Sequence, residues 1–575
     1  MASTPTPQTP RLTQRAPLSC VPCSLKKVKC NKRMPCSTCI RKGEASQCRR
    51  ENVYLTGGRQ RPVSALAFRD YEEVVAENFR LRAALSQSQG VFPHATPSAE
   101  TPAGTSAAFV PDSTLLDYLS ELFNAVCDSG HPNSVFSPQD IHLPSRELSD
   151  RILAHAGAET TWHHFAIHYP TFMDEHDQFW RWCSNGGEHA DYDPHWLAIY
   201  FSLLAEVLYL KLDDWWPQDT DAAGSEAMLH IQNWFDAAIF LLQKADFIRA
   251  PDIRCVQAIA ILGDVFIVLG HRSCFFNLWP VAIRTAQMLG IDREENLAKH
   301  PPLEAELYRR LWWSLVIGDW LIVPYRTPLV RIDDFNVNMP SLADDDELAD
   351  VGGVIPARAE PDPRPMQYQL ALIEGAKIYY EFQQMLRAGK WMENDAVALV
   401  ARTDEKIAKL IAQLPAFLRA DGDEVTEDDE FRYPWMEQQR SNICYTLLDG
   451  QIAFFSTLTS LGPAEANARS RARSVCVATS RTILQLALQG RDDRIKNWFT
   501  ITTLFMTCIS LITLQQGDEG PDTVWADVET VYKVCDILRA KGSENRLASA
   551  ALEILERAIR RRWPAHPRPI HIPTL

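Results

Sequence analysis

Six cysteines lie within 29 residues, from Cys20 to Cys48, with the spacing CX2CX6CX5CX2CX8C. This pattern is two CX2C pairs, each followed by a third thiol. A tetrahedral Zn²⁺ takes four thiolates, so six serve two ions only if two of the thiolates bridge both metals. The alternatives are a disulfide knot or a single-zinc finger with two spare cysteines. We expect two structural zinc ions per chain, bound by Cys20, Cys23, Cys30, Cys36, Cys39 and Cys48.

The same region is strongly basic, although the chain of 575 residues has a net charge of −15. Residues 1–62 hold thirteen Lys and Arg against two Glu, which leaves 45 basic and 71 acidic residues for the rest. A basic head on an acidic body indicates that the head meets a polyanion. The cluster of thiolates is itself anionic, so nearby lysines could instead offset its charge.

The cysteine segment resembles the fungal binuclear zinc cluster, the six-cysteine, two-zinc DNA-binding module of fungal transcription regulators. The resemblance implies that Cys20 and Cys36 bridge the metals, that Cys23 and Cys30 complete one site, and that Cys39 and Cys48 complete the other. Pro35 matches the proline of the loop between the halves. A stretch this short and polar has no core of its own, so we expect it to unfold without zinc.

Between Cys23 and Cys30 the segment SLKKVK predicts a short helix with its lysines facing outward. In the resembling family the tip of this helix enters the major groove, where lysines donate to guanine O6 and N7 of a CGG triplet. Ser24 stands where that family commonly has arginine. We expect Lys27 to contact bases and the remaining cations to hold phosphates. The predicted DNA-binding set is Lys26, Lys27, Lys29, Lys32, Arg33, Arg41 and Lys42.

A three-base half-site is too short to be unique in a genome, so specificity requires two heads at a fixed spacing. In the stretch DYEEVVAENFRLRAAL, four apolar residues and Asn78 fall at alternating steps of three and four, the a and d positions of a coiled coil. The alternative is one amphipathic helix packed on its own body. The predicted homodimer seam consists of Tyr71, Val74, Asn78, Leu81 and Leu85.

The remainder of the chain shows helical periodicity and few strand patterns, so the predicted fold is mostly all-α with a large helical regulatory domain. Three stretches resemble the middle homology domain of fungal regulators: HYPTFMDEHDQFW, WPVAIRTAQMLGIDRE and ELYRRLWWSLVIGDW. The predicted order is a disordered tail (1–16), the zinc cluster (17–51), a linker (52–69), a short coiled coil (70–85), a flexible linker (86–111) and the helical domain (112–575).

Several features of this body have simpler explanations than function. Trp312 and Trp313 read as core, and WFTITTLFMTCISLITL reads as a buried helix rather than a membrane span. Asp319, paired with Arg309 or Arg310, could be structural or part of an effector site. The acidic runs ADDDELAD and DGDEVTEDDE read as solvated loops rather than activation segments.

Enzymatic chemistry has no positive signal in this sequence. His164 and His168 have the spacing of a helical zinc pair, but phenylalanine, not glutamate, follows His164, and no P-loop, dinucleotide fingerprint or nucleophile elbow is present. We therefore expect a nuclear transcription factor that is not an enzyme and regulates a metabolic or secondary-metabolite gene set, more often by activation. Its expected partners are double-stranded DNA, the transcription machinery or co-regulators and a candidate small-molecule effector, with no membrane. The alternative is a zinc-stabilised protein-interaction adaptor or corepressor that does not read DNA sequence.

Overall fold

The computed structural model of the chain falls into two compact units, Met1–Arg80 and Leu81–Leu575. The structure describes residues 11–13, 22–23, 26–28, 37–42, 53–55, 114–126, 133–215, 221–321, 327–350, 363–389, 392–422, 429, 432–489, 495–515, 520–542 and 544–564. The predicted coiled-coil seam, Tyr71 to Leu85, lies outside these residues and stays a prediction.

The described part of the first unit consists of short elements. Strand β1 (Arg11–Thr13) pairs in parallel with β2 (Val53–Leu55), so that Leu12 lies opposite Tyr54. Helix α2 is Ser37–Arg41. These two strands come from either side of the cysteine segment in the sequence.

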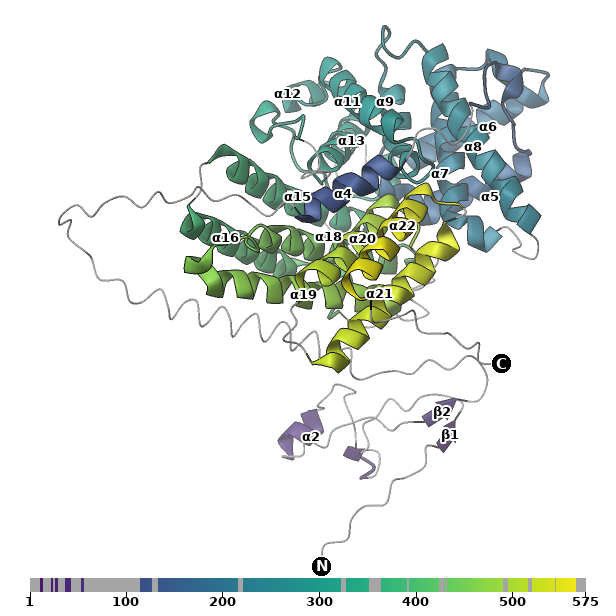
Figure 1. The fold of residues 1–575 in the computed structure, drawn as a ribbon. Helices are drawn as coiled ribbons and strands as arrows, with labels where there is room; N and C mark the ends of the chain where they lie inside the picture. Colours follow the sequence, from purple (N-terminus) through teal and green to yellow (C-terminus); the bar gives the residue numbers. More distant parts are fainter. Residues whose placement is uncertain are drawn as a thin grey trace, which may run out of the picture. The chain divides into compact units, whose positions relative to one another are not determined.

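All regular elements in the described residues of the second unit are helices, which confirms the predicted all-α body (Figure 1). Its helices are α4 (Thr114–Ala125), α5 (Arg146–His155), α6 (Tyr169–Ser184), α7 (Pro194–Trp215), α8 (Asp221–Lys244), α9 (Ile253–Ile261), α10 (Gly263–Phe266), α11 (Arg272–Met288), α12 (Glu294–Leu297), α13 (Pro302–Leu321), α14 (Asp345–Asp350), α15 (Pro365–Ala388), α16 (Glu393–Gln413), α18 (Met436–Ser456), α19 (Ala466–Gln489), α20 (Trp498–Leu514), α21 (Pro521–Lys541) and α22 (Arg546–Arg562).

Side chains and glycines set the ends of these helices as the sequence predicts. Asp252 and Asn497 accept the Arg254 and Thr500 backbone N–H groups at the starts of α9 and α20, at 2.8 and 2.7 Å. Gly290 lies two residues after the end of α11, and its φ of +76° suits a residue without a side chain.

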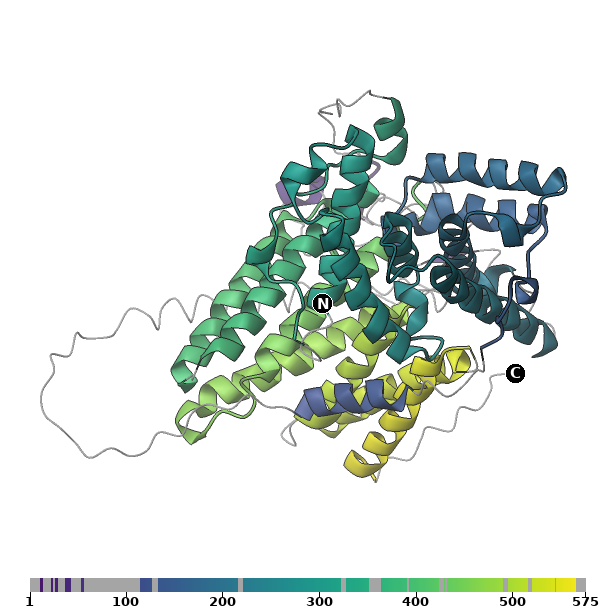
Figure 2. The ribbon, with the colours of Figure 1, turned by 90° about the horizontal axis from the view of Figure 1, so that it is seen from above.

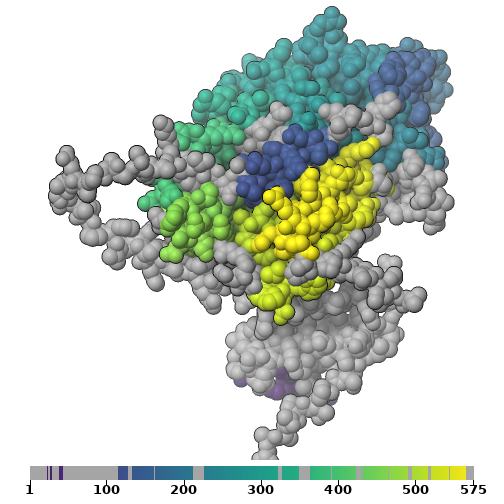
Figure 3. Space-filling view, in the orientation of Figure 1, coloured from purple at the N-terminus to yellow at the C-terminus, as the bar shows by residue number. Residues whose placement is uncertain are grey.

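Two buried apolar clusters hold the unit together. The larger runs from α4 to α22, and the smaller fills the space among α15, α16, α18 and the start of α19. Figure 2 shows the latter helices as a layer of long rods beside the α7–α13 region. Helix α4 packs against α20 and α22, and Figure 3 shows it in dark blue against the yellow C-terminal helices. The first and last helices of the unit therefore share one core.

Helix α20 is the apolar stretch that could be mistaken for a membrane span. Its residues are almost all buried inside the unit, including Cys508, Phe505 and Thr507, so the predicted buried helix is confirmed. The hydroxyl of the buried Thr507 bonds back to its own helix, at the Thr503 carbonyl, with a distance of 2.6 Å. None of the described helices is long and apolar enough to cross a membrane.

Candidate nucleic-acid interface and regulatory body

The first half of the cysteine segment forms one closed helical turn. The Lys26 N–H donates to the Pro22 carbonyl at 3.1 Å, and the Val28 N–H donates to the Cys23 carbonyl at 3.0 Å. Lys27 has a φ of +48°, in the left-handed region, and this conformation ends the turn. The predicted helix over SLKKVK is thus closed at Lys27 rather than continuous, and the side chains of Lys26 and Lys27 are exposed at its tip.

The second half of the segment repeats the arrangement in α2. Cys39 lies inside this helix, and the Lys42 N–H donates to the Thr38 carbonyl at 3.2 Å just beyond its end. Arg41 and Lys42 are exposed. Each half therefore has a cysteine in a short helical turn and two exposed cations following it.

The burial pattern of these turns fits a metal-centred core. Cys23 and Cys39 are each 2% exposed, and they are the only buried residues among those of the first unit whose side chains the structure describes. A small domain whose buried groups are thiols, not large apolar side chains, is the type that metal–thiolate bonds stabilise. The donor set therefore suits zinc.

The other predicted site residues lie outside the described residues. They are the ligands Cys20, Cys30, Cys36 and Cys48 and the cations Lys29, Lys32 and Arg33.

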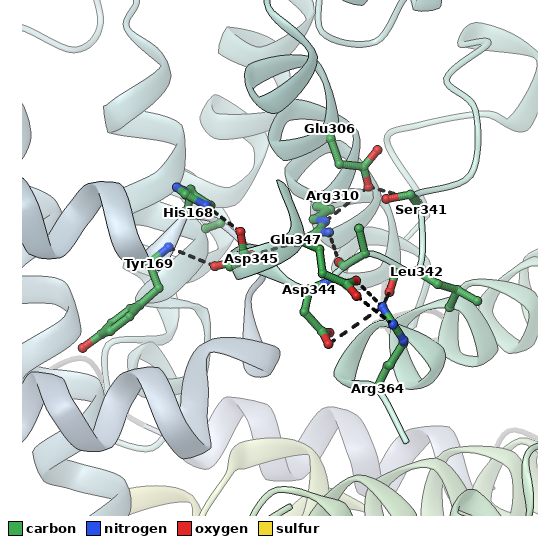
Figure 4. Close-up of polar contacts among 12 residues, drawn as sticks. His168, Tyr169, Glu306, Arg310, Ser341, Leu342, Asp344, Asp345, Glu347 and Arg364 are labelled. Atoms are coloured by element: carbon green, nitrogen blue, oxygen red, sulfur yellow. Dashed lines mark hydrogen bonds and ion pairs between the residues drawn. The ribbon is translucent and has the colours of Figure 1, made fainter. Parts of the chain in front are cut away.

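In the helical unit, the acidic run from Ala343 to Asp350 was expected to be a solvated loop, and that prediction is wrong. Most of it forms α14, which two arginines hold on the body (Figure 4). The buried Arg310 binds Asp345 at 3.0 Å and Glu306 at 3.3 Å. Arg364 binds Glu347 at 2.5 Å. Charge pairing with buried cations therefore gives these carboxylates a structural role.

The same helix is tied to the start of α6. The Tyr169 N–H donates to the Asp345 carboxylate at 2.9 Å, and His168 Nε2 lies 3.0 Å from the Asp345 carbonyl oxygen (Figure 4). Since His168 Nδ1 also contacts the Thr171 hydroxyl at 2.7 Å, both of its ring nitrogens are engaged. His168 does not form the zinc pair with His164 that their spacing allows. The run DGDEVTEDDE lies largely outside the described residues.

Asp319 has different partners from those the sequence suggested. Its carboxylate accepts the Leu329 and Val330 N–H groups, at 2.8 and 2.9 Å, and neither Arg309 nor Arg310 binds it. Burial raises the pKa of Asp319 to about 6, against the lowering effect of these two bonds. It ties the end of α13 to the segment that follows. Trp312 and Trp313 are buried, as predicted for core residues.

Comparison with known proteins finds one family model that matches part of each unit. The family model described as "Fungal Zn(2)-Cys(6) binuclear cluster domain" matches residues 18–53, and "Fungal specific transcription factor domain" matches residues 159–400. The "Aurofusarin cluster transcription factor aurR2" of Gibberella zeae is 26% identical over 60% of this chain and 50% of its own length. The "Probable transcription factor lepB" of Aspergillus flavus is 25% identical over 75% of this chain and 80% of its own.

The match thus spans about half the length of the first of these relatives. The solved "Structure of the K. lactis CBF3 core" covers 79% of this chain and 92% of its own at 13% identity, with a TM-score of 0.47. The assignment comes from the two domain matches, which have the order that the zinc cluster and helical body have in the structure. The chain thus carries a fungal Zn(2)-Cys(6) binuclear cluster domain followed by a fungal specific transcription factor domain.

Proposed function

We propose that this chain is a sequence-specific DNA-binding transcription factor that reads CGG-type half-sites with paired zinc clusters. The observation that carries the proposal is the turn at Cys23, which places the exposed Lys26 and Lys27 directly after a buried thiol. A metal that fixes the cysteine also fixes the backbone from which these lysines project. Lysine is a donor that suits guanine O6 and N7 in the major groove.

Zinc supplies the rigidity of the domain and takes no part in a reaction. Two ions per chain would be held by the six cysteines, with Cys20 and Cys36 bridging, as the family resemblance implies. Arg41 and Lys42, exposed beyond α2, are placed to contact phosphates, which adds affinity and salt dependence without sequence information.

We further propose that the chain binds DNA as a homodimer through residues 70–85, acts in the nucleus and controls a biosynthetic gene cluster. The last rests on a relative whose name refers to the aurofusarin cluster. The structure of the helical unit supports a role in regulation rather than DNA contact, because its acidic helix α14 is held by ion pairs on a body rich in carboxylates.

The test is DNA binding by the zinc-loaded full chain to paired CGG triplets of varied orientation and spacing, at several salt concentrations. Binding should depend on spacing, weaken steeply with salt and disappear when zinc is chelated. The charge reversals Lys26→Glu and Lys27→Glu should abolish it. The matched control is Lys406→Glu, which reverses an exposed lysine of the helical unit. Spacing-blind binding that tolerates both reversals would support the adaptor instead.

A further inference from the structure

A buried polar cluster lies where three segments of the helical unit meet. His163 ends the 3-10 turn Thr161–His163, Glu206 lies in the middle of α7, and Asp264 lies in α10. One ligand atom from each of these three side chains lies within 4.8 Å of the other two. The cluster belongs to neither the cysteine segment nor the α14 network.

The carboxyl group of Glu206 has no hydrogen-bond partner in the described part of the protein. The residue is 0% exposed. Burial raises its pKa well above the ordinary value. A buried carboxyl group without a partner is costly, and such groups in native proteins usually bind an ion, a water or another polar group.

His163 brings an imidazole nitrogen to the cluster. Its side chain is 4% exposed, and its Nδ1 lies 2.9 Å from Asp264 Oδ2. The Trp162 ring lies against the imidazole with 4.0 Å between ring centroids. The Nδ1 atom and the Asp264 oxygen are therefore close enough to each other to bind the same ion.

His164 supports Glu206 without being a ligand itself. Its Nδ1 accepts the Ala166 N–H at 3.0 Å, so its Nε2 carries the proton in the neutral ring. That Nε2 lies 3.7 Å from Glu206 Oε2, too far for a hydrogen bond but with its positive edge toward the carboxylate. Phe165, with a φ of +47°, turns the chain directly after these two histidines.

We propose that His163, Glu206 and Asp264 bind one divalent transition-metal ion inside the helical unit, separate from the zinc of the cysteine cluster. One imidazole nitrogen and two carboxylates suit Mn²⁺, Fe²⁺ or Zn²⁺, and two ionised carboxylates neutralise a dication. The side chain of Asp264 is 25% exposed and gives the ion a route from solvent. A bound ion would join the 3-10 turn to α7 and α10.

Manganese is the probe that distinguishes this site from the cysteine cluster, because Mn²⁺ prefers oxygen and nitrogen ligands to thiolates. The experiment uses the full chain with zinc in its cysteine cluster and follows free Mn²⁺ by electron paramagnetic resonance. We expect one Mn²⁺ per chain and a rise in Tm as it binds. Asp264→Asn and His163→Gln should weaken this binding at least about tenfold.

The matched control is His300→Gln, which removes the histidine of an exposed His–Glu pair (3.3 Å) in the same unit. It should bind Mn²⁺ like the original chain. Glu206→Gln should lower Mn²⁺ affinity while raising the Tm of the manganese-free chain, because it removes a buried carboxyl group; a purely structural Glu206 would lower that Tm. No Mn²⁺ uptake by the original chain, or uptake unchanged by Asp264→Asn, would overturn the proposal.

Discussion

Arg310 in α13 binds the Asp345 carboxylate at 3.0 Å while its Nε contacts Glu306, itself 3% exposed, at 3.3 Å. One buried guanidinium thus holds the acidic helix α14 and neutralises a buried glutamate on its own helix. Glu306 Oε1 also accepts the Ser341 N–H at 2.8 Å, so this carboxylate oxygen has a second partner besides Arg310.

Replacing this arginine should be strongly destabilising. Arg310→Met keeps most of the volume but removes the buried cation that joins Asp345 to Glu306, and it leaves Glu306 with Arg309, at 3.3 Å, as its remaining cation. We expect a loss of about 3–5 kcal/mol in the free energy of unfolding. Urea denaturation followed by circular dichroism measures it. Arg249→Gln is the control: Arg249 binds Asp246 and its side chain is 82% exposed, so its loss should cost far less. Equal losses for the two variants would contradict a special role for Arg310.

A pair of helical glycines should respond to alanine in opposite directions. A Cβ on Gly318 of α13 would lie 2.5 Å from Trp279 Cζ2, whose ring is held by a bond from its Nε1 to the Leu315 carbonyl. Gly318→Ala should therefore destabilise the chain by about 1–3 kcal/mol. A Cβ on Gly450 of α18 meets only ordinary contacts with Phe454 at 3.7 Å, so Gly450→Ala should stabilise by up to about 1 kcal/mol.

Thermal unfolding of these two variants beside the original chain distinguishes the cases. The account fails if Gly318→Ala raises Tm as Gly450→Ala does.

The buried Asp319 predicts a pH dependence of stability. Its pKa is raised from 3.8 to about 6, so its favourable contribution is present below pH 4 and is lost as the pH rises through about 6. Asp319→Asn removes this titration while its amide oxygen can still accept a backbone N–H. Relative to the original chain, the variant should become more stable between pH 4.5 and pH 7, by about 3 kcal/mol at most. Denaturant unfolding of both proteins across this range is the measurement, and a constant difference would refute it.

Local signals in the sequence were enough for the helical body. The helical pattern of α11 stops just before Gly290, and a glycine at such a place predicts a helix end. The apolar character of α20 predicts that the helix is buried. The buried tryptophans of α13 follow from the same reasoning, since each lies on an apolar stretch.

Contacts between distant segments could not be predicted in the same way. The sequence shows that ADDDELAD is acidic, but not that Arg310 and Arg364 bind it, because those ion pairs depend on how α13 and α15 pack. The sequence suggests an ion pair between Asp319 and Arg309 or Arg310, whereas the carboxylate accepts backbone N–H groups of a later segment. The cluster of His163, Glu206 and Asp264 joins three segments that are far apart in the sequence, so no spacing of residues predicts it.

The most direct test of the central claim asks whether Lys27 reads the bases of the CGG triplet. The measurement is the affinity of the zinc-loaded full chain for paired CGG sites and for sites with the central base changed. The same affinities are measured for the variants Lys27→Ala and Lys27→Gly and for the control Lys406→Ala. Glycine suits the left-handed backbone of this position and removes the ammonium group without straining the turn.

The original chain and Lys406→Ala should prefer CGG by about 1–3 kcal/mol per changed base pair, and both Lys27 variants should lose most of that preference. Weaker binding by the Lys27 variants with the preference unchanged would contradict base reading by Lys27 and leave it as a phosphate contact.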